Sequence, residues 1–199
     1  GLAVDDAFDL VGHSFGGALA LRLARDMTER VRTLTLIEPA AFFLLKGIGV
    51  VEDMLFSQVA KVALAVQAGV AMGTEQSRQA AMACFVDYWN GPGKWDSLPP
   101  QLRQSVAGQA DVIGLDFCAL FAETMRIADC RDIAVPTLVI NGLHSPLPVQ
   151  RIAVMLFTGH DHADQQQQNE NAHGSARFLF ESFVERDEIF GRVQVDCGV

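Results

Sequence analysis

The chain has 199 residues, half of which are hydrophobic, and its formal net charge is −9. This length suits one globular domain with a sizeable core, and the apolar content excludes an intrinsically disordered chain. The acidic balance argues against nucleic acid or an anionic membrane as the main partner and is typical of a solvated, soluble surface.

The first three elements in chain order predict a βαβ unit. Residues 7–11 have the pattern of a buried strand, residues 16–30 that of an amphipathic helix, and residues 31–37 that of a second strand, which Pro39 ends. Because strand, helix and strand follow one another at this spacing, we expect parallel pairing with a right-handed crossover.

The middle of the chain, about 42–129, has helical periodicity and no strand pattern. Asn90-Gly91-Pro92-Gly93 is an evident break within it. A helical insertion between sheet strands would form a cap over a site at the strand ends. The expected helices are 52–70, 75–89, 101–110 and 115–127.

The sheet pattern returns after this insertion, with a short apolar strand at 137–140 and a helix at 149–157. The sequence therefore predicts a single domain, 1–199, whose core lies in 1–41 and 130–199. The remaining expectations are a glutamine-rich loop at 164–171, an amphipathic helix at 176–185 and a weak strand at 189–199.

The four cysteines bear on the compartment of the protein. Cys84 and Cys118 lie in apolar helical patterns, and neither Cys130 nor Cys197 completes the spacing of a disulfide framework or a zinc site. Buried free thiols are therefore expected, which favours a reducing compartment and a cytoplasmic location.

Two further observations concern membranes and targeting. The most apolar window, 59–72, contains Lys61 and Gln67 and is too short to span a bilayer, so no membrane partner is expected. No signal peptide is visible, but the chain begins at Gly1 rather than at Met, so we expect an N-terminal part to be missing.

The most informative motif is Gly12-His13-Ser14-Phe15-Gly16, between the first strand and the first helix. G-x-S-x-G in this context predicts a nucleophile elbow, a strained turn that exposes the serine at the helix N-terminus. Gly12 and Gly16 would remove side chains that block the crossing of strand and helix. The plainer interpretation is a glycine-bounded turn with an incidental serine, and a phosphate loop is disfavoured because no lysine follows the glycines.

This elbow, the strand end Leu36-Ile37-Glu38-Pro39, the helical middle and the segment from Val135 to Gly142 together resemble the α/β-hydrolase superfamily. The resemblance covers about residues 8–152, in the expected order. It implies an α/β fold with a partial, mostly parallel sheet flanked by helices, a helical cap insertion and a Ser–His–acid triad.

The resemblance implies Ser14 as the nucleophile and the backbone N–H of Phe15 as one oxyanion-hole donor. The family takes its second donor from a loop on an earlier strand, which this sequence does not contain. We therefore expect either a fragment of a hydrolase or an incomplete site.

The position of the triad acid departs from the usual family pattern. The family often places an aspartate where this sequence has Ser145, and a hydroxyl cannot supply the negative charge that stabilises an imidazolium. Glu38 ends the strand after the elbow, where some family members carry their acid, and it is the candidate. An ordinary strand-end carboxylate is the equal alternative.

The candidate base is His160, because Thr158-Gly159-His160 resembles the family's Gly-His before its last helix. His162 and His173 are the alternatives, as is an ordinary polar loop. The same histidines could form a zinc cluster, but glutamines interrupt the stretch, so neither a metal nor an organic cofactor is expected.

The candidate substrate-pocket residues are His13, Phe42, Phe43 and Trp89, with core packing as the alternative for the aromatic ones. The leading hypothesis is a serine hydrolase that cleaves an ester or related acyl bond of a small, fairly apolar molecule. Acyl transfer, C–C bond hydrolysis and peptidase action stay open, because fold does not fix function. The alternative is a catalytically impaired or non-catalytic ligand-binding member, and the oligomeric state is not predicted.

Overall fold

The computed structural model describes residues 7–167 and 178–183, and it describes side chains over residues 7–158. Within these residues, four parallel strands form one sheet in the order β1-β2-β3-β4. This confirms the expected α/β fold with a parallel sheet flanked by helices. The strands are β1 (Phe8–His13), β2 (Val31–Ile37), β3 (Thr137–Gly142) and β4 (Phe178–Phe183).

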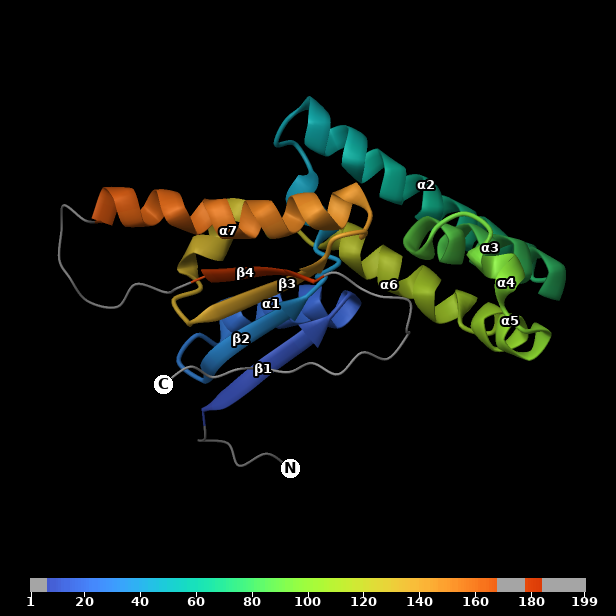
Figure 1. Cartoon of the computed structure of the whole chain (residues 1–199), viewed down its shortest axis with the longest axis horizontal. Helices are drawn as coiled ribbons and strands as arrows, with labels where there is room; N and C mark the ends of the chain where they lie inside the picture. Colours follow the sequence, from blue (N-terminus) through green and yellow to red (C-terminus); the bar gives the residue numbers. More distant parts are fainter. Residues whose placement is uncertain (1–6, 168–177, 184–199) are drawn as a thin grey trace.

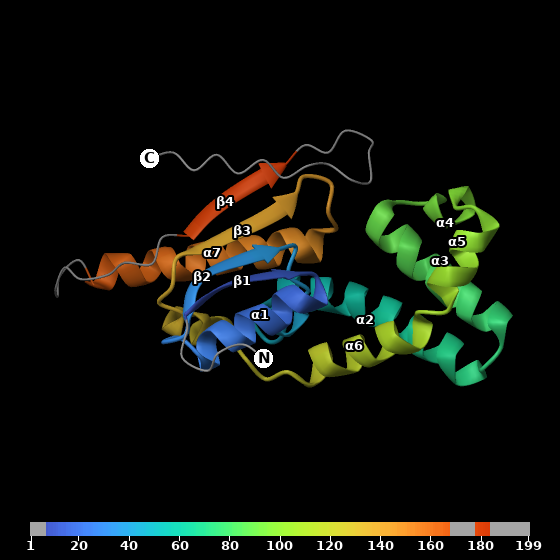
Figure 2. The ribbon, with the colours of Figure 1, turned by 90° about the horizontal axis from the view of Figure 1, so that it is seen from below.

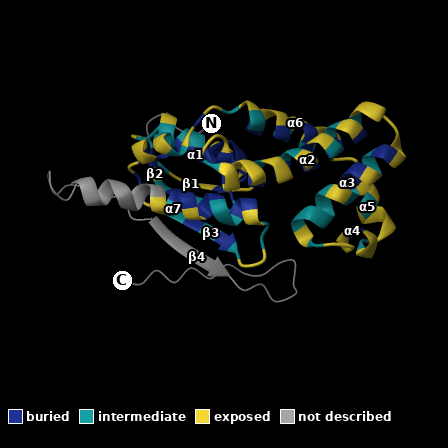
Figure 3. Cartoon of the chain, turned by 90° about the horizontal axis from the view of Figure 1, so that it is seen from above, coloured by how far each residue is buried: buried dark blue, intermediate teal, exposed yellow. Residues whose placement is uncertain are grey.

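Two helices cover the same face of this sheet, α1 (Phe15–Asp26) and α7 (Leu147–Gln167) (Figures 1 and 2). Since the strands follow one another in a single direction across the sheet, right-handed crossovers place α1, between β1 and β2, and α7, between β3 and β4, on one side. The register aligns Leu36 of β2 with Gly12 of β1 and Val139 of β3, so a buried apolar row faces the helices. Figure 3 shows this burial along β3.

Every regular element between β2 and β3 is a helix. We call α2 to α6 the helical insertion; it lies beyond one end of the strands (Figure 1). Its bounds, with those of the two short 3-10 helices that flank it, are η1 (Phe42–Leu45), α2 (Val50–Met72), α3 (Glu75–Asn90), α4 (Lys94–Ser97), α5 (Pro100–Ala107), α6 (Ala110–Ala122) and η2 (Ile127–Asp132).

The hairpin of α2 and α3 is fixed by local chemistry. Gly73 ends α2 in the left-handed conformation at φ 70°, and Thr74 caps α3 by accepting the N–H of Ser77. The Ser77 hydroxyl donates to the carbonyl of Gly69 at 2.7 Å. A Cβ on Gly69 would lie 2.5 Å from that of Ala81, so the glycine allows the two helices to approach closely.

Helix α2 is long and apolar, with a mean hydropathy of 1.4 over its most apolar window. Length and composition alone would allow it to cross a membrane, but a core helix of a soluble protein meets the same test. In the structure, its buried residues, among them Val59 and Val66, pack toward α3 and α6.

Two expectations for the second half of the chain were wrong. Residues 178–183, predicted within a helix, form β4, because pairing along β3 decides a short apolar segment whose periodicity is ambiguous. Residues 164–167 are helical rather than looped, since α7 continues to Gln167 and glutamine is a good helix former. The predicted strand at 189–199 and residues 168–171 lie outside the described residues.

The thiols are free as expected, but two of them are not buried. Cys84 and Cys118 are exposed, because each lies on the outward side of its helix, while Cys130 is buried. Burial raises the pKa of the Cys130 thiol to about 12. Cys197 lies outside the described residues.

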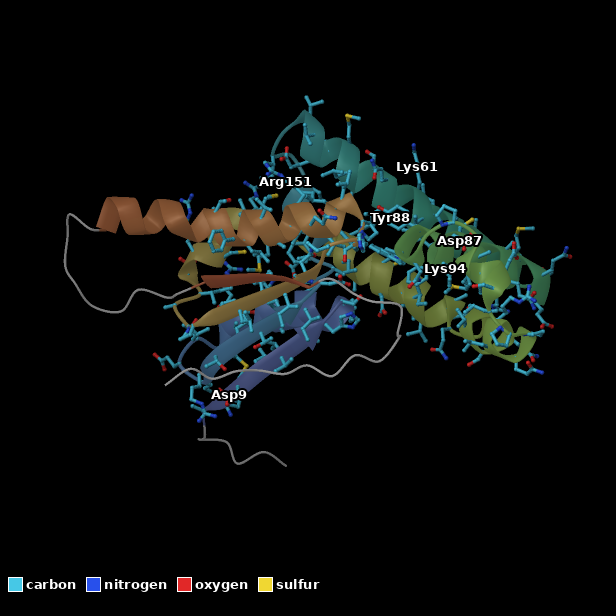
Figure 4. All side chains as sticks on the ribbon, viewed as in Figure 1. Asp9, Lys61, Asp87, Tyr88, Lys94 and Arg151 are labelled. Carbon is cyan, nitrogen blue, oxygen red and sulfur yellow. The ribbon has the colours of Figure 1, made fainter. Side chains whose placement is uncertain are left out.

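One ion pair ties the start of the helical insertion to the sheet layer. The Arg151 guanidinium, on α7 where it approaches the start of α2, donates from Nε to Glu52 Oε1 at 2.8 Å (Figure 4). The Glu52 side chain is only 8% exposed. A hydrogen bond from its own backbone N–H and the Arg151 guanidinium lower the pKa of Glu52.

We expect Glu52→Gln to lower the melting temperature at pH 7 more than Glu29→Gln, an exposed control on the surface. Because folding lowers the pKa of Glu52, its contribution to stability is present above the unfolded-state pKa of 4.5 and is lost as pH falls through the folded-state pKa. Thermal unfolding between pH 3 and 7 checks this: the difference between Glu52→Gln and wild type should shrink toward low pH. A difference independent of pH would contradict it.

Candidate active site

Ser14 stands on the turn between β1 and α1 in a conformation that L-residues rarely adopt, with φ 52° and ψ −122°. Its backbone groups hold it there. The Ser14 N–H donates to the carbonyl of Ile37 at 3.0 Å, and its carbonyl accepts the N–H groups of Gly17 and Ala40, each at 2.9 Å. The turn is thus bonded to α1 on one side and to the end of β2 on the other.

Two glycines make this crossing possible. A Cβ on Gly12 would lie 2.3 Å from the carbonyl oxygen of Gly16, and one on Gly17 would lie 2.9 Å from Cα of Pro39. A Cβ on Gly16 would meet nothing within 4 Å. The predicted role of Gly12 therefore agrees with the geometry, but the second close approach belongs to Gly17 and not to Gly16.

Ser14 is exposed toward a cavity of about 360 Å³. The elbow, the end of β2 and the start of α7 form one side of the cavity, and α3 and α6 of the helical insertion form the other. Phe15, which also lines it, is the first residue of α1. Its backbone N–H is among the helix N-terminal donors that have no partner within the helix, which suits a developing oxyanion.

Glu38 lies at the same cavity, which brings the predicted acid to the predicted nucleophile. Its Oε1 accepts the backbone N–H of Gly142 at 3.0 Å and the hydroxyl of Ser145. Ser145 occupies the position that the sequence analysis set aside for lack of charge, and here it holds the carboxylate instead of replacing it. The close approach also needs Gly142, whose added Cβ would lie 2.8 Å from Glu38 Oε1.

Backbone strain marks these two residues together. Within the described part of the chain, Ser14 and Glu38 are the only non-glycine residues with positive φ, 52° and 44°. Conformations of this kind persist only where the surrounding structure enforces them, and they cluster at functional sites. Their occurrence on two neighbouring strand ends at one cavity supports a functional reading of both.

The backbone of α7 carries the predicted base away from Ser14. Val149 lines the cavity at the start of this helix, and His160 follows eleven residues later, about 16 Å along the helix axis (Figure 1). His160 and His162 fall on the C-terminal half of α7, beyond the described side chains, and His173 lies outside the described residues. Of the described histidines, His13 lines the cavity and His144 is exposed in the loop after β3. Over residues 7–158, no side chain is hydrogen-bonded to the Ser14 hydroxyl, and no group of three potential metal ligands occurs in the described chain.

Two of the three aromatic residues predicted at the substrate pocket line the cavity, and one does not. Phe42 and Trp89 line the cavity and stack with ring centroids 5.9 Å apart. Phe43 does not line it: this residue is buried on the other side of η1 and borders a separate hollow beside Lys46. Consecutive residues of a 3-10 helix point in different directions, so Phe42 and Phe43 could not both face one cavity.

The turn after Trp89 is fixed by Asp87, near the end of α3 (Figure 4). Its carboxylate accepts the backbone N–H groups of Gly93 at 3.1 Å and Trp95 at 2.7 Å. These bonds close the break that the sequence shows at residues 90–93. They hold Trp89 and Asn90 at the cavity.

The sequence analysis missed the contribution of α6. Four of its residues line the cavity, namely Ile113, Asp116, Phe117 and Leu120. Their spacing of three, four and seven residues is that of one helix face, which is the signal that was available. Burial raises the pKa of Asp116.

Comparison with known proteins places these observations in a family. A family model described as alpha/beta hydrolase fold matches residues 4–171. No curated protein matches the chain.

Solved structures similar to the chain include three bacterial proteins: an alpha/beta hydrolase from Sphaerobacter thermophilus, NosK from Streptomyces actuosus and a probable hydrolytic enzyme from Pseudomonas aeruginosa. Their identities are 18%, 21% and 17%, and their TM-scores are 0.49, 0.41 and 0.46. The matches cover 94%, 88% and 89% of this chain, which spans 63%, 59% and 56% of those proteins.

We expect Gly12→Ala to destabilise the protein by about 1–3 kcal/mol, because the added methyl group meets backbone that can move only by opening the elbow. Gly16→Ala is the matched control and should be neutral or slightly stabilising, since its Cβ meets nothing and alanine favours helix. Urea unfolding measures both. Equal free energies of unfolding for the two variants would contradict the geometry.

Proposed function

The chain belongs to the alpha/beta hydrolase fold family, and we propose on this premise that it is a serine hydrolase with Ser14 as nucleophile. The observation that carries the proposal is the strained conformation of Ser14. Its φ of 52° places it at the start of α1, exposed to a cavity with aromatic walls. An incidental surface serine would not need this strained conformation, nor the backbone hydrogen bonds to Ile37, Gly17 and Ala40 that hold it.

In the proposed reaction, the Ser14 hydroxyl attacks the substrate carbonyl and gives its proton to a histidine. The backbone N–H of Phe15 stabilises the oxyanion that forms. When the tetrahedral intermediate collapses, the histidine returns the proton to the leaving alcohol, and an acyl-enzyme remains. Water, activated by the same histidine, then releases the acid and restores the Ser14 hydroxyl. Because α7 carries His160 away from Ser14, we assign this histidine to His13, which lines the cavity, or to His144, in the loop after β3.

Glu38 is the proposed orienting acid. A triad carboxylate must be held still while it stabilises an imidazolium. The N–H of Gly142 and the hydroxyl of Ser145 both hold Oε1 of Glu38, at a cavity that it shares with Ser14. These contacts favour the triad role over that of an ordinary strand-end carboxylate.

The proposed substrate is a small ester or related acyl compound. A cavity of about 360 Å³ is at the small end of ligand sites, and Phe42, Phe85, Trp89 and Phe117 supply apolar walls. No cofactor is required for this chemistry. The free, exposed Cys84 and Cys118 support a cytoplasmic location as part of the same proposal.

A fluorophosphonate probe should label wild-type protein on Ser14 and leave Ser14→Ala unlabelled, as intact-mass spectrometry would show. Either His13→Ala or His144→Ala should slow labelling by roughly 100-fold or more, because general-base assistance is worth about that factor. His160→Ala, on the part of α7 that lies away from the cavity, is the control and should label at the wild-type rate. Ligand binding without any labelling would instead favour the non-catalytic alternative.

Glu38→Gln should lower kcat for a p-nitrophenyl ester by at least about 100-fold, because the amide cannot stabilise the imidazolium. Ser145→Ala should cost less, since the Gly142 N–H still holds the carboxylate. Steady-state kinetics distinguishes the two, with the exposed Glu29→Gln as control. Equal kcat for Glu38→Gln and wild type would remove Glu38 from the mechanism.

A further inference from the structure

Asp116 is a carboxylate in the apolar wall of the active-site cavity. It lies on α6 between Ile113 and Phe117, and all three line the cavity. The other walls come from Phe42, Phe85 and Trp89. Its side chain is half-buried, and the loss of water around it raises the pKa of Asp116.

No protein group compensates this charge. Over the described side chains, Asp116 has no hydrogen bond and no ion pair, and desolvation is the one influence on its pKa. Among the described side chains, other half-buried carboxylates are paired, for example Glu38 with Gly142 and Ser145, and Glu123 with Arg22. A carboxylate in an apolar wall is costly unless it meets a partner, so Asp116 marks a place where a ligand supplies one.

The charges around the cavity indicate whether the ligand group that meets Asp116 is a cation or an anion. Among its described lining residues there is no lysine or arginine, and the second carboxylate is Glu38. The formal charge of the whole chain, −9, has the same sign. An anionic ligand group would meet repulsion here, whereas a cation would be attracted.

The aromatic rings select the kind of cation. Phe85 contacts both Trp89 and Phe117 in edge-to-face geometry, with ring centroids 6.1 and 6.2 Å apart, and Trp89 stacks on Phe42. Ring faces of tryptophan and phenylalanine attract cations, and weakly hydrated substituted ammonium groups bind best between such rings. A carboxylate within an aromatic wall is therefore a suitable site for an alkylammonium group.

We propose that Asp116 and the aromatic residues beside it bind a substituted ammonium group, so that the substrate is an ester or related acyl compound that carries a cationic amine. This proposal rests on the proposed function for the reaction itself. The substrate would place its carbonyl at Ser14, on the sheet side of the cavity, and its amine at α6, on the side of the helical insertion. Asp116 is then a specificity-determining residue and takes no part in the bond cleavage.

The test compares two acetate esters of nearly identical shape, one of a trimethylammonium-ethyl alcohol and one of its neutral tert-butyl isostere. Wild type should hydrolyse the cationic ester with a kcat/KM roughly tenfold higher, a factor in keeping with a desolvated cation site. Asp116→Asn should abolish that preference by raising KM for the cationic ester alone. Asp96→Asn, which removes the same charge from an exposed position on α4, should leave the preference intact.

A binding measurement separates this proposal from the proposed function. Benzyltrimethylammonium should quench the tryptophan fluorescence of Ser14→Ala in a saturable way, and Asp116→Asn should weaken that binding roughly tenfold. Absence of probe labelling and of turnover, with this binding preserved, would overturn the hydrolase proposal only. Labelling of Ser14 without cation preference, or equal binding by wild type and Asp116→Asn, would overturn the ammonium site only. Asp116→Asn should melt no lower than wild type, because it removes an unpaired and partly desolvated charge.

Discussion

The close crossing of β1, α1 and the end of β2 is the constraint on which the rest of the site depends. Strand and helix can meet in this way only because Gly12 and Gly17 have no side chains, since a Cβ on either would collide with backbone or with Pro39. The same crossing forces Ser14 to positive φ, and its amide and carbonyl bond to Ile37 and Ala40. The turn at Ser14 and the end of β2 are therefore one hydrogen-bonded unit, and hydrogen bonds to the end of β2 hold Ser14 in its strained conformation.

This unit also places the proposed acid. In the sequence, Glu38 lies between Ile37 and Ala40, whose backbone groups bond Ser14. The N–H of Glu38 donates to the carbonyl of Ile140 in β3 at 2.9 Å. Its side chain then reaches Gly142 and Ser145, beyond the end of β3. Three strand ends thus contribute to one site through backbone geometry, as expected where parallel strands end at a common edge. The helical insertion leaves the sheet after β2 and returns to it at β3, so this network joins the two ends of the insertion.

The parts that the sequence predicted well are those that local chemistry decides. The elbow needs glycine at fixed positions, and the βαβ unit has unambiguous periodicity, so Ser14, β1, α1 and β2 were all predictable. Long-range contacts decided the errors. Pairing with β3 makes residues 178–183 a strand, and the direction of the short η1 helix sends Phe42 to the cavity and Phe43 to the core. The function of Ser145 was hidden because it depends on Glu38, 107 residues away in the sequence.

The cavity therefore joins two parts with different physical requirements. On the sheet side, glycines and strained backbone fix Ser14 and Glu38, so a side chain added at Gly12, Gly17 or Gly142 would displace them. On the insertion side, one face of α6 and the aromatic residues of α3 line the cavity through side chains alone. Replacing Asp116 by an apolar residue would alter the charge of the cavity wall without moving the turn at Ser14. Since an unpaired carboxylate costs stability in the free protein, its binding energy is available only to a ligand that carries the matching cation.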